Sequence, residues 1–569
     1  MPTSRFPADT LRGPASWIRG WRWLLAALLL GWWTTGCASL PANTQQVPSK
    51  AFLSPEQTPL GQLVAARRAE AHTRSDSGFR LLAAVDAALA SRLALIDEAT
   101  RTLDLQYYAI HADASTEVLL QHLRDAARRG VRVRILLDDF NSVGEDAQVL
   151  RLAFEPNVQM RLFNPLPGSR RNMLGRIVAS LHDFGRMQKR MHNKLFIADN
   201  AWGITGGRNL GDVYFGEGEK QNFVDLDVLA AGRIVRDMSA SFDHFWNDEL
   251  AYPVKTLLDP EELEKLRQPQ GLVKEAQAEP VLPVTVSPTV LPTVTPTAVA
   301  QAERPPMDLR TVPLIWAPAL LLVDQPGKIG PGDDEVDAGE TAIDGLLNFM
   351  LGAQRDVLIV SPYFVPGERM MAVYRKLRER GVRIRVLTNS LASNDAPAAQ
   401  AGYMHYRDEL LKIGVELYEM RADPETAASL LGSSGSGGGS HEKHRGAWIG
   451  SGPGGSKGGN ARASLHSKAV FIDQRLAVIG SMNLDLRSEL KNSEVGLVIR
   501  SAALSQQATQ QVEHTLATAA YHLELRDGHL HWSAPAGASF RDADSEPGAS
   551  TRLKLLVYLL GPFAPDQML

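Results

Sequence analysis

The sequence contains one short pattern twice: a histidine, a lysine two positions later and an aspartate five positions after that lysine. The two copies stand 274 positions apart, and each is followed at the same distance by a glycine-rich segment that ends in asparagine. Two histidines and two lysines could form a metal-free site that cleaves phosphodiesters. One imidazole would attack phosphorus, the other would protonate the leaving oxygen, and the two ammonium groups would hold the phosphate. The copies comprise His192, Lys194 and Asp199, then His466, Lys468 and Asp473; the glycine-rich segments contain Gly207 and Asn209, then Ser481 and Asn483.

The residues around each copy predict a β-hairpin. On a strand, residues i and i+2 share a face, so the histidine and lysine of each pair are expected to project together. Asp199 and Asp473 fall at the predicted turns, and we assign them to fixing the hairpin rather than to contacting a substrate. The glycine-rich segments at the ends of the return strands can bring backbone N–H and side-chain amide groups close to a phosphate oxygen.

A nucleophilic histidine must be neutral, so its other ring nitrogen needs an acceptor. Glu494 lies 28 residues after His466, and Asp225 lies 33 residues after His192. These two acids are the candidates for orienting the imidazoles, with Asp227 as the alternative in the first half.

The two halves of the chain repeat the elements that would position these residues. In 128–137 and again in 378–387, a charged turn with a glycine ends an amphipathic helical stretch and leads into a β-branched strand. Strands alternating with helices predict an α/β fold in which a mixed sheet packs between helices, formed twice. The second half is longer because of a Gly/Ser-rich stretch at 432–460, expected to be a flexible surface insertion, and residues 275–306 have the composition of an extended Pro-rich linker.

These motifs resemble those of the phospholipase D superfamily, and more narrowly its bacterial cardiolipin synthase C branch. The narrower likeness includes 105–108, 190–194, 206–212 and 388–395. The resemblance implies two phospholipase D-type α/β/α sandwich domains related by a pseudo-twofold axis, with one site at their interface. It also implies a phosphohistidine intermediate and neither metal nor cofactor. By the same resemblance His192 is the nucleophile and His466 the acid, with the reverse assignment open, and Lys194, Lys468, Asn209 and Asn483 hold the phosphate.

The N-terminal region predicts export. Arginines precede an apolar run from Trp23 to Trp33, and small residues then lead to Cys37, the single cysteine of the chain. This order is typical of a secretory signal with a lipobox, in which Cys37 would be lipidated; a plain uncleaved anchor is the alternative. We therefore expect a membrane-anchored lipoprotein on the periplasmic side, with the outer membrane favoured. The predicted organisation is a signal over 1–36, a tether over 37–75, a first domain over 76–255, a Pro-rich linker over 256–310, a second domain over 311–520 and a C-terminal extension over 521–569.

The expected activity is transfer of a phosphatidyl group to make cardiolipin from phosphatidylglycerol and either phosphatidylethanolamine or a second phosphatidylglycerol. The alternatives are a hydrolytic phospholipase D releasing phosphatidic acid, a nuclease, or a non-catalytic envelope protein that binds lipid. A net charge of −4 supplies no basic field, so phospholipids rather than nucleic acid are the expected partners, and a helper protein is left open. Tyr107, Tyr108, Tyr363 and Phe364 could line a lipid cleft or simply pack. The apolar tail at 553–560 could touch a membrane, but a buried terminal helix is favoured.

Overall fold

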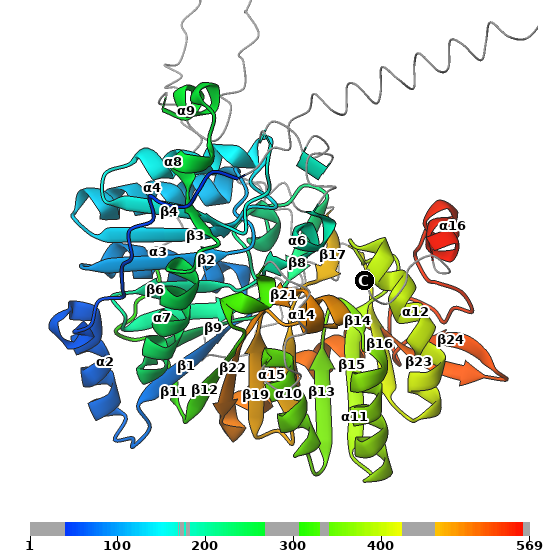
Figure 1. Cartoon of the computed structure of the whole chain (residues 1–569). Helices are drawn as coiled ribbons and strands as arrows, with labels where there is room; N and C mark the ends of the chain where they lie inside the picture. The colour runs from blue at the N-terminus through cyan, green and yellow to red at the C-terminus, as the bar shows by residue number, and fades with distance from the viewer. Residues whose placement is uncertain are drawn as a thin grey trace, which may run out of the picture.

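The computed structural model describes residues 40–168, 170, 176–177, 183–267, 306–330, 341–423 and 461–560. These residues form two nine-stranded mixed sheets that lie side by side (Figure 1). The predicted signal, Cys37, the Gly/Ser-rich stretch and most of the Pro-rich linker lie outside the described residues.

The first sheet has the strand order β10-β4-β3-β2-β6-β7-β9-β1-β11, in which β2, β3 and β4 run parallel and the other pairs are antiparallel. Helices α3 and α4 cover one face of this sheet and α7 covers the other. The strands are β1 (Ser77–Leu82), β2 (Thr102–Tyr107), β3 (Arg132–Asp138), β4 (Val158–Phe163), β6 (Leu195–Ala198), β7 (Trp202–Gly206), β9 (Asp227–Gly232), β10 (Ala251–Pro253) and β11 (Ile315–Trp316); the helices are α3 (Val85–Glu98), α4 (Ala114–Arg128), α6 (Phe184–Gln188), α7 (Arg233–Trp246), α8 (Val254–Leu257) and α9 (Pro260–Arg267).

The second sheet has the order β12-β22-β19-β18-β13-β15-β16-β23-β24, and its parallel strands are β13, β15 and β16. Its strands are β12 (Ala319–Val323), β13 (Asp356–Val360), β15 (Arg383–Asn389), β16 (Glu416–Met420), β18 (Ala469–Ile472), β19 (Leu476–Gly480), β22 (Val495–Arg500), β23 (Ala520–Arg526) and β24 (His529–Ser533). The helices are α10 (Ala342–Leu351), α11 (Gly367–Glu379), α12 (Pro397–Lys412), α14 (Leu486–Leu490), α15 (Ala502–Thr518) and α16 (Thr551–Leu560), and β14 (Phe364–Val365) pairs with β20 (Leu484–Asp485) apart from the sheet.

Eight strands of each sheet follow the same order, and the ninth strand, β11 or β24, is added at opposite edges of the two sheets. In each half, an outer helix ends at a glycine with positive φ, Gly130 at +95° and Gly381 at +77°, and the chain then enters the middle parallel strand of its sheet. Glycine adopts this backbone conformation without a Cβ clash, so it ends the helix and turns the chain. The repeated helix-turn-strand unit predicted from the sequence is therefore present in both halves.

A shared hydrophobic core joins the two sheets. Alternate residues of a strand face opposite sides, so Phe196 packs under the outer helices while Ile197 packs into the core shared by both halves. In the second half, Val470 packs under the outer helices and Phe471 packs into the shared core. Because α7 and α15 both pack into the shared core, the interface between the halves is part of the protein interior.

Residues 40–75 do not form the tether that the sequence predicts. They pack on the first half through α2 (Pro59–Glu70), which Thr58 caps by accepting the Gly61 N–H, and Leu60 of this helix is fully buried. The side chains of Asn43 and Gln46 also donate hydrogen bonds to backbone carbonyls near the end of α7. The predicted end of the second domain at residue 520 also differs from the structure, because β23 and β24 from the predicted C-terminal extension form the last two strands of the second sheet. Within the described ranges, no helix has the length and apolar content needed to cross a bilayer.

Candidate active site

Two pairs of very short parallel strands connect the halves at the predicted site. Strand β5 (Arg190–Met191) pairs with β21 (Asn492–Ser493), and β8 (Gln221–Val224) pairs with β17 (Arg462–Leu465). One strand of each pair ends immediately before a motif histidine, and the other ends immediately before a candidate acid. Each histidine is thus placed next to the acid of the opposite half. The histidines and lysines precede β6 and β18 on connecting segments rather than within regular strands.

The pairing of histidines and acids is crossed between the halves. His192 Nδ1 lies 3.0 Å from Glu494 Oε2, and His466 Nδ1 lies 2.6 Å from Asp225 Oδ2. The two candidate acids therefore both contact a motif imidazole, and each does so across the boundary between the halves. Asp227, the alternative acid, instead accepts from Arg92 Nη2 at 2.9 Å inside the first half.

Backbone hydrogen bonds hold the crossed arrangement in place. The His192 N–H donates to the Ser493 carbonyl at 3.0 Å, and the His466 N–H donates to the Val224 carbonyl at 2.8 Å. Each histidine is therefore held by both its backbone and its ring to one segment of the other half.

The carboxylates select the tautomer of both rings. With a carboxylate at Nδ1, that nitrogen carries the proton, so Nε2 has a free lone pair. Burial and the nearby Lys194 lower the pKa of His192 to about 4, despite the opposing effect of Glu494. Burial, the lysines and His192 itself lower the pKa of His466 well below its ordinary value. With their pKa values lowered in this way, both rings are neutral at pH 7 in the free protein.

The two acids are supported in different ways. Glu494 accepts the Ser481 hydroxyl and the Ser488 hydroxyl, the latter at 2.7 Å, in addition to His192. Burial opposes its ionisation, but the adjacent His192 and Lys194 nevertheless lower the pKa of Glu494. Three donors therefore fix this carboxylate in its charged form.

The Asp225 carboxylate depends on a glycine instead. A Cβ on Gly207, the counterpart of Ser481, would stand 2.1 Å from Asp225 Oδ1. The carboxylate also accepts the Leu226 N–H at 2.8 Å. Burial raises the pKa of Asp225, with Lys468 opposing. Gly207 thus provides the space that this shorter acid occupies beside His466.

Both motif lysines are buried beside their histidines. Lys194 Nζ donates to the His192 carbonyl at 2.8 Å, and Lys468 Nζ donates to that of His466. Burial lowers the pKa of Lys194 to about 7 and that of Lys468 to about 8. Two ammonium groups with this little solvation would favour an anion placed between them.

The two asparagines that end the glycine-rich segments are not equivalent. Asn209 donates to the Tyr214 hydroxyl at 3.0 Å and accepts the Ala109 N–H at 3.3 Å. Asn483 is also buried, yet its Oδ1 has no hydrogen-bond partner among the described residues. A buried polar atom is rarely left unpaired, so Asn483 is the asparagine that is available to a ligand.

Aromatic rings lie against both imidazoles. The Tyr108 ring centroid is 5.2 Å from that of His192, and the rings of Tyr214 and Phe223 lie 5.3 Å and 4.8 Å from that of His466. These rings limit the exposed fractions of His192 and His466 to 8% and 6%. Of the other aromatic residues singled out in the sequence, Tyr107 and Phe364 pack in the cores, and the Tyr363 hydroxyl donates to Asp395 at 2.9 Å.

The motif aspartates lie at the hairpin turns. Asp199 accepts the backbone N–H groups of Thr100, Arg101 and Thr102 at 2.8–3.0 Å. Asp473 does the same for three consecutive N–H groups, the last of which belongs to Asp356, the first residue of β13. Both residues have a positive φ, 51° and 53°, which asparagine and aspartate tolerate better than most residues. The aspartates join each hairpin to the start of the neighbouring strand.

Sequence reasoning missed a second layer of support around Glu494. Asp324 accepts the Glu494 N–H at 2.9 Å, and its own N–H donates to the Glu494 carbonyl at 3.0 Å. Lys328 Nζ donates to Asp324 at 2.7 Å and to the Ser488 carbonyl at 2.9 Å. No motif marks these residues. Their only sequence signal is an acid and a lysine four positions apart, which occurs by chance in many proteins.

Comparisons with known proteins agree with this geometry. The family model described as "Cardiolipin synthase, PLD-like domain" matches residues 93–246, 346–444 and 451–516. Cardiolipin synthase C of Escherichia coli (strain K12) is 36% identical over 449 residues, 78% of this chain and 86% of the relative. Cardiolipin synthase A of Pseudomonas entomophila (strain L48) is 24% identical over 443 residues, covering 77% of this chain and 68% of the relative.

A solved structure supports the fold separately. The crystal structure of phosphatidylserine synthase from Haemophilus influenzae Rd KW20 superposes with a TM-score of 0.50 at 13% identity, covering 88% of this chain and 99% of that chain. The predicted fold class, two phospholipase D-type domains, is thereby confirmed. With more than half of its residues matched by the family model and a relative at 36% identity, the chain belongs to the cardiolipin synthase family of PLD-like domain proteins.

Proposed function

We propose that this protein is a phosphatidyltransferase that makes cardiolipin from phosphatidylglycerol and either phosphatidylethanolamine or a second phosphatidylglycerol. The observation that carries the proposal is that each motif imidazole is oriented by a carboxylate of the opposite half and stands beside a buried lysine. The likeness to proteins named cardiolipin synthases supports the choice of a lipid substrate.

In the first step, the His192 Nε2 lone pair attacks the phosphorus of the donor lipid. The bond from phosphorus to the headgroup oxygen breaks as the P–N bond forms, and His466 Nε2 gives its proton to the departing alcohol. Glu494 stabilises the positive charge that develops on the His192 ring, since its carboxylate lies 3.0 Å from Nδ1. The headgroup, glycerol or ethanolamine, leaves with a neutral hydroxyl group, and the ammonium charge of ethanolamine is unchanged by the step.

In the second step, a glycerol hydroxyl of another phosphatidylglycerol attacks the phosphohistidine. His466, now neutral, accepts the hydroxyl proton, the P–N bond breaks, and His192 is restored. Asp225 supports both tasks of His466, because its carboxylate stabilises the protonated ring while the proton on Nδ1 stays on the ring. The sequence of steps is balanced and leaves the protein unchanged.

The lysines complete the site. Lys194 and Lys468 would stabilise the phosphoryl oxygens as negative charge shifts on them, and the side-chain amide N–H group of Asn483 would donate to the same oxygens. A bound phosphodiester anion also counteracts the low pKa of His466, because an adjacent negative charge favours the protonated ring. The substrate itself thus helps to charge the general acid.

We further propose that Cys37 is lipidated and that the protein is exported and held on the periplasmic side, with the outer membrane favoured. This proposal is supported by the sequence of residues 1–39 and by the chemistry of the substrates, which remain in a bilayer. Metabolic labelling with a radioactive fatty acid tests it. Label should enter the wild-type protein and not Cys37→Ser, and equal labelling of both would refute the assignment.

Incubating the purified full-length protein with labelled phosphatidylglycerol, with and without phosphatidylethanolamine, tests the reaction. The expected product is cardiolipin, and neither His192→Ala nor His466→Ala should form it. Release of phosphatidic acid alone would refute transfer and establish a hydrolytic phospholipase D. Absence of any lipid product from a folded, active-site-intact protein would refute both lipid activities.

A further inference from the structure

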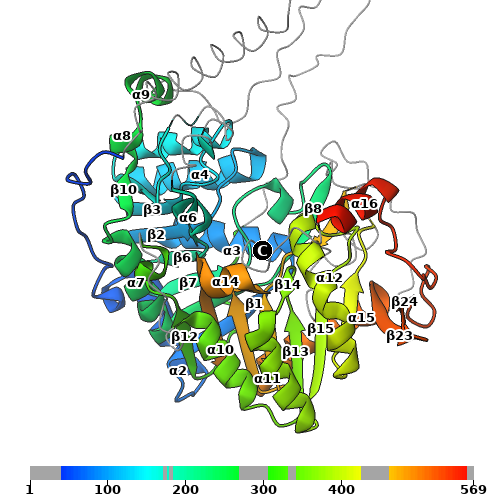
Figure 2. The ribbon, with the colours of Figure 1, turned by 45° about the vertical axis from the view of Figure 1, so that its right-hand side comes forward.

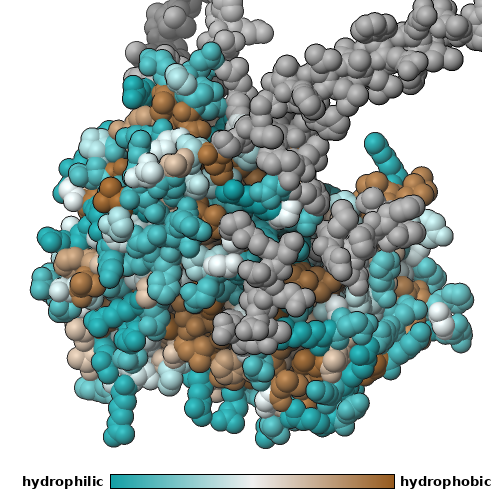
Figure 3. All heavy atoms as spheres, viewed as in Figure 1, coloured by the Kyte–Doolittle hydropathy of each residue, from teal (hydrophilic) through white to brown (hydrophobic). Residues whose placement is uncertain are grey.

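The C-terminal helix α16 leaves most of its apolar side chains in solvent. Leu555, Leu556, Tyr558 and Leu559 are 57%, 45%, 77% and 57% exposed, and Val557 is 1% exposed. These four make up half of the eight exposed large hydrophobic residues in the described part of the chain. The favoured interpretation of a buried terminal helix is therefore wrong. Figure 3 shows hydrophobic residues gathered at the upper right, where Figure 1 places α16.

The composition of α16 indicates what could cover it. The helix contains Arg552 and Lys554 near its start, no acidic residue, and otherwise almost entirely leucine, valine and tyrosine. A helix that is apolar on nearly all sides is normally covered. Leucines beside a tyrosine and two cations match the interface of an anionic bilayer, where apolar groups enter the acyl region and cations meet lipid phosphates.

The helix is connected to the active site through a short packed path. Val557 packs against Leu391, in the loop that follows β15. Asn389, the last residue of β15, holds Leu465, the residue before His466, by donating to its carbonyl at 2.9 Å and accepting its N–H at 2.8 Å. Burial lowers the pKa of Lys468, and the charge of Asp395, further along this loop, offsets part of that effect together with Asp225 and Glu494. A bilayer in contact with α16 would therefore lie beside the loop that flanks the second catalytic motif.

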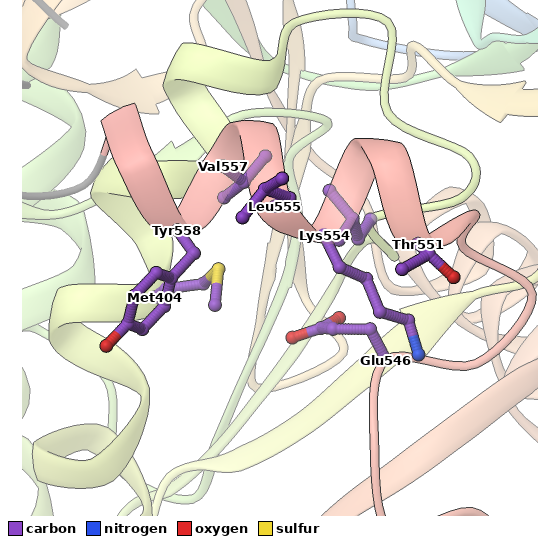
Figure 4. Close-up of a pocket in the computed structure, with 8 residues that line it drawn as sticks. Met404, Glu546, Thr551, Lys554, Leu555, Val557 and Tyr558 are labelled. Carbon is purple, nitrogen blue, oxygen red and sulfur yellow. The ribbon is translucent and has the colours of Figure 1, made fainter.

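A groove of about 400 Å³ lies between α16 and α12, which pack side by side (Figures 2 and 4). Leu391, Met404 and Val557 line it, and Tyr558 stands at one end with Met404, whereas Lys554 and Glu546 lie at the other. Glu546 is paired with Arg407 at 2.6 Å. Lys554 Nζ donates to the Ser545 hydroxyl at 3.2 Å and forms no ion pair with a carboxylate among the described residues. The groove extends the apolar surface of the helix towards the protein.

We propose that α16 is a docking helix that inserts Leu555, Leu556, Tyr558 and Leu559 into an anionic lipid surface and holds the active site beside it. The inference rests on the proposed function, since the lipid substrates remain in the bilayer. A bilayer is favoured over a second copy of the helix because α16 contains two cations and no acidic residue, so a second α16 would offer Arg552 and Lys554 no carboxylate partner, whereas anionic headgroups would.

A fluorescence experiment locates the helix directly. The single cysteine allows full-length Cys37→Ser to serve as a cysteine-free background, into which Leu556→Cys introduces one polarity-sensitive label. Vesicles of phosphatidylglycerol and phosphatidylethanolamine should shift the emission to the blue, and nitroxide-labelled lipids should quench it. The matched control is Lys376→Cys on the exposed face of α11, whose label should not respond. An unchanged Leu556→Cys signal with bound vesicles would overturn the proposal.

An activity experiment separates docking from chemistry. The variant Leu556→Glu/Leu559→Glu, in the same Cys37→Ser background, should bind these vesicles at least about tenfold more weakly and lose activity on them to a similar extent. Its activity on monomeric short-chain phosphatidylglycerol should equal that of the parent, because neither residue touches the catalytic groups. Equal activity of variant and parent on vesicles would refute docking while leaving the proposed function intact. If the parent is inactive on both substrates, the proposed function fails, and the label alone decides docking. Burial of the label without lipid, in a dimer that the glutamates dissociate, would assign the face to a second copy and overturn the proposal.

Discussion

The crossed pairing of histidines and acids makes a prediction about which chemical step each acid supports. In Asp225→Asn, the partner of His466 Nδ1 at 2.6 Å loses its charge, although Asp225 belongs to the half that carries His192. In Glu494→Gln, the partner of His192 Nδ1 loses its charge. If His192 attacks and His466 donates the proton, Asp225→Asn should behave like a variant of His466. Glu494→Gln should behave like a variant of His192.

The size of the effect follows from the geometry. A hydrogen bond to a charged group contributes about 1.5–3 kcal/mol, which corresponds to roughly 10- to 150-fold in rate. An asparagine can also donate to Nδ1 and so stabilise the wrong tautomer, and loss of orientation in a comparable carboxylate–histidine pair reaches about 10⁴. We therefore expect Asp225→Asn to slow turnover of phosphatidylglycerol by about 10² to 10⁴.

A change of leaving group identifies the affected step. A phosphatidyl ester of p-nitrophenol needs no proton on its departing oxygen, so formation of the phosphohistidine in Asp225→Asn should recover to within about tenfold of wild type. Glu494→Gln should remain slow with both substrates, because attack is impaired in each. Single-turnover release of p-nitrophenol measures this step. Recovery in Glu494→Gln but not in Asp225→Asn would show that the histidines have the reverse roles; equal recovery in both would refute the division of labour.

The remaining predictions concern the support around the site. Gly207→Ala should reduce turnover at least about 100-fold, because a Cβ would displace the Asp225 carboxylate from His466. Ser481→Ala removes one of the three donors to Glu494 and should reduce turnover about tenfold or less. Similar losses in both variants would contradict the different support of the two acids. Sulfate inhibition should weaken at least about tenfold from pH 6 to pH 9, since a lysine is charged only below its pKa and those of Lys194 and Lys468 are about 7 and 8. An inhibition constant that does not change with pH would show that these lysines do not bind the anion. Asp199→Asn should lower the free energy of unfolding by about 1–3 kcal/mol in urea titrations while kcat at 25 °C stays within about threefold of wild type, and a large loss of kcat without loss of stability would place Asp199 in the catalytic machinery.

The fold could be predicted because its signals are local and occur twice. Gly130 and Gly381 each end a helix before a parallel strand, and the hydrophobic alternation on either side is visible in both halves. The histidines and lysines were found in the same way, by type and repeated spacing. Such signals depend only on neighbours in the chain, so a single sequence contains them.

The pairing of acids could not be predicted in this way. It depends on β5, β8, β17 and β21, of which two are only two residues long, too short to show any hydrophobic period. It also requires that strands from distant parts of the chain meet, which local spacing does not specify. Residues 40–75 were mistaken for a tether because α2 lacks clear periodicity, although Thr58 followed by Pro59 is a typical helix start that could have indicated it.

The pairing of short strands across the two halves limits how such a protein can be divided. Cut between its two sheets, the first fragment would hold His192 without Glu494, and the second would hold His466 without Asp225. Neither fragment could work until it met the other. By the same logic, an ancestor built from one repeat would already have needed to associate as a symmetric dimer, and gene fusion would only have made that partnership permanent.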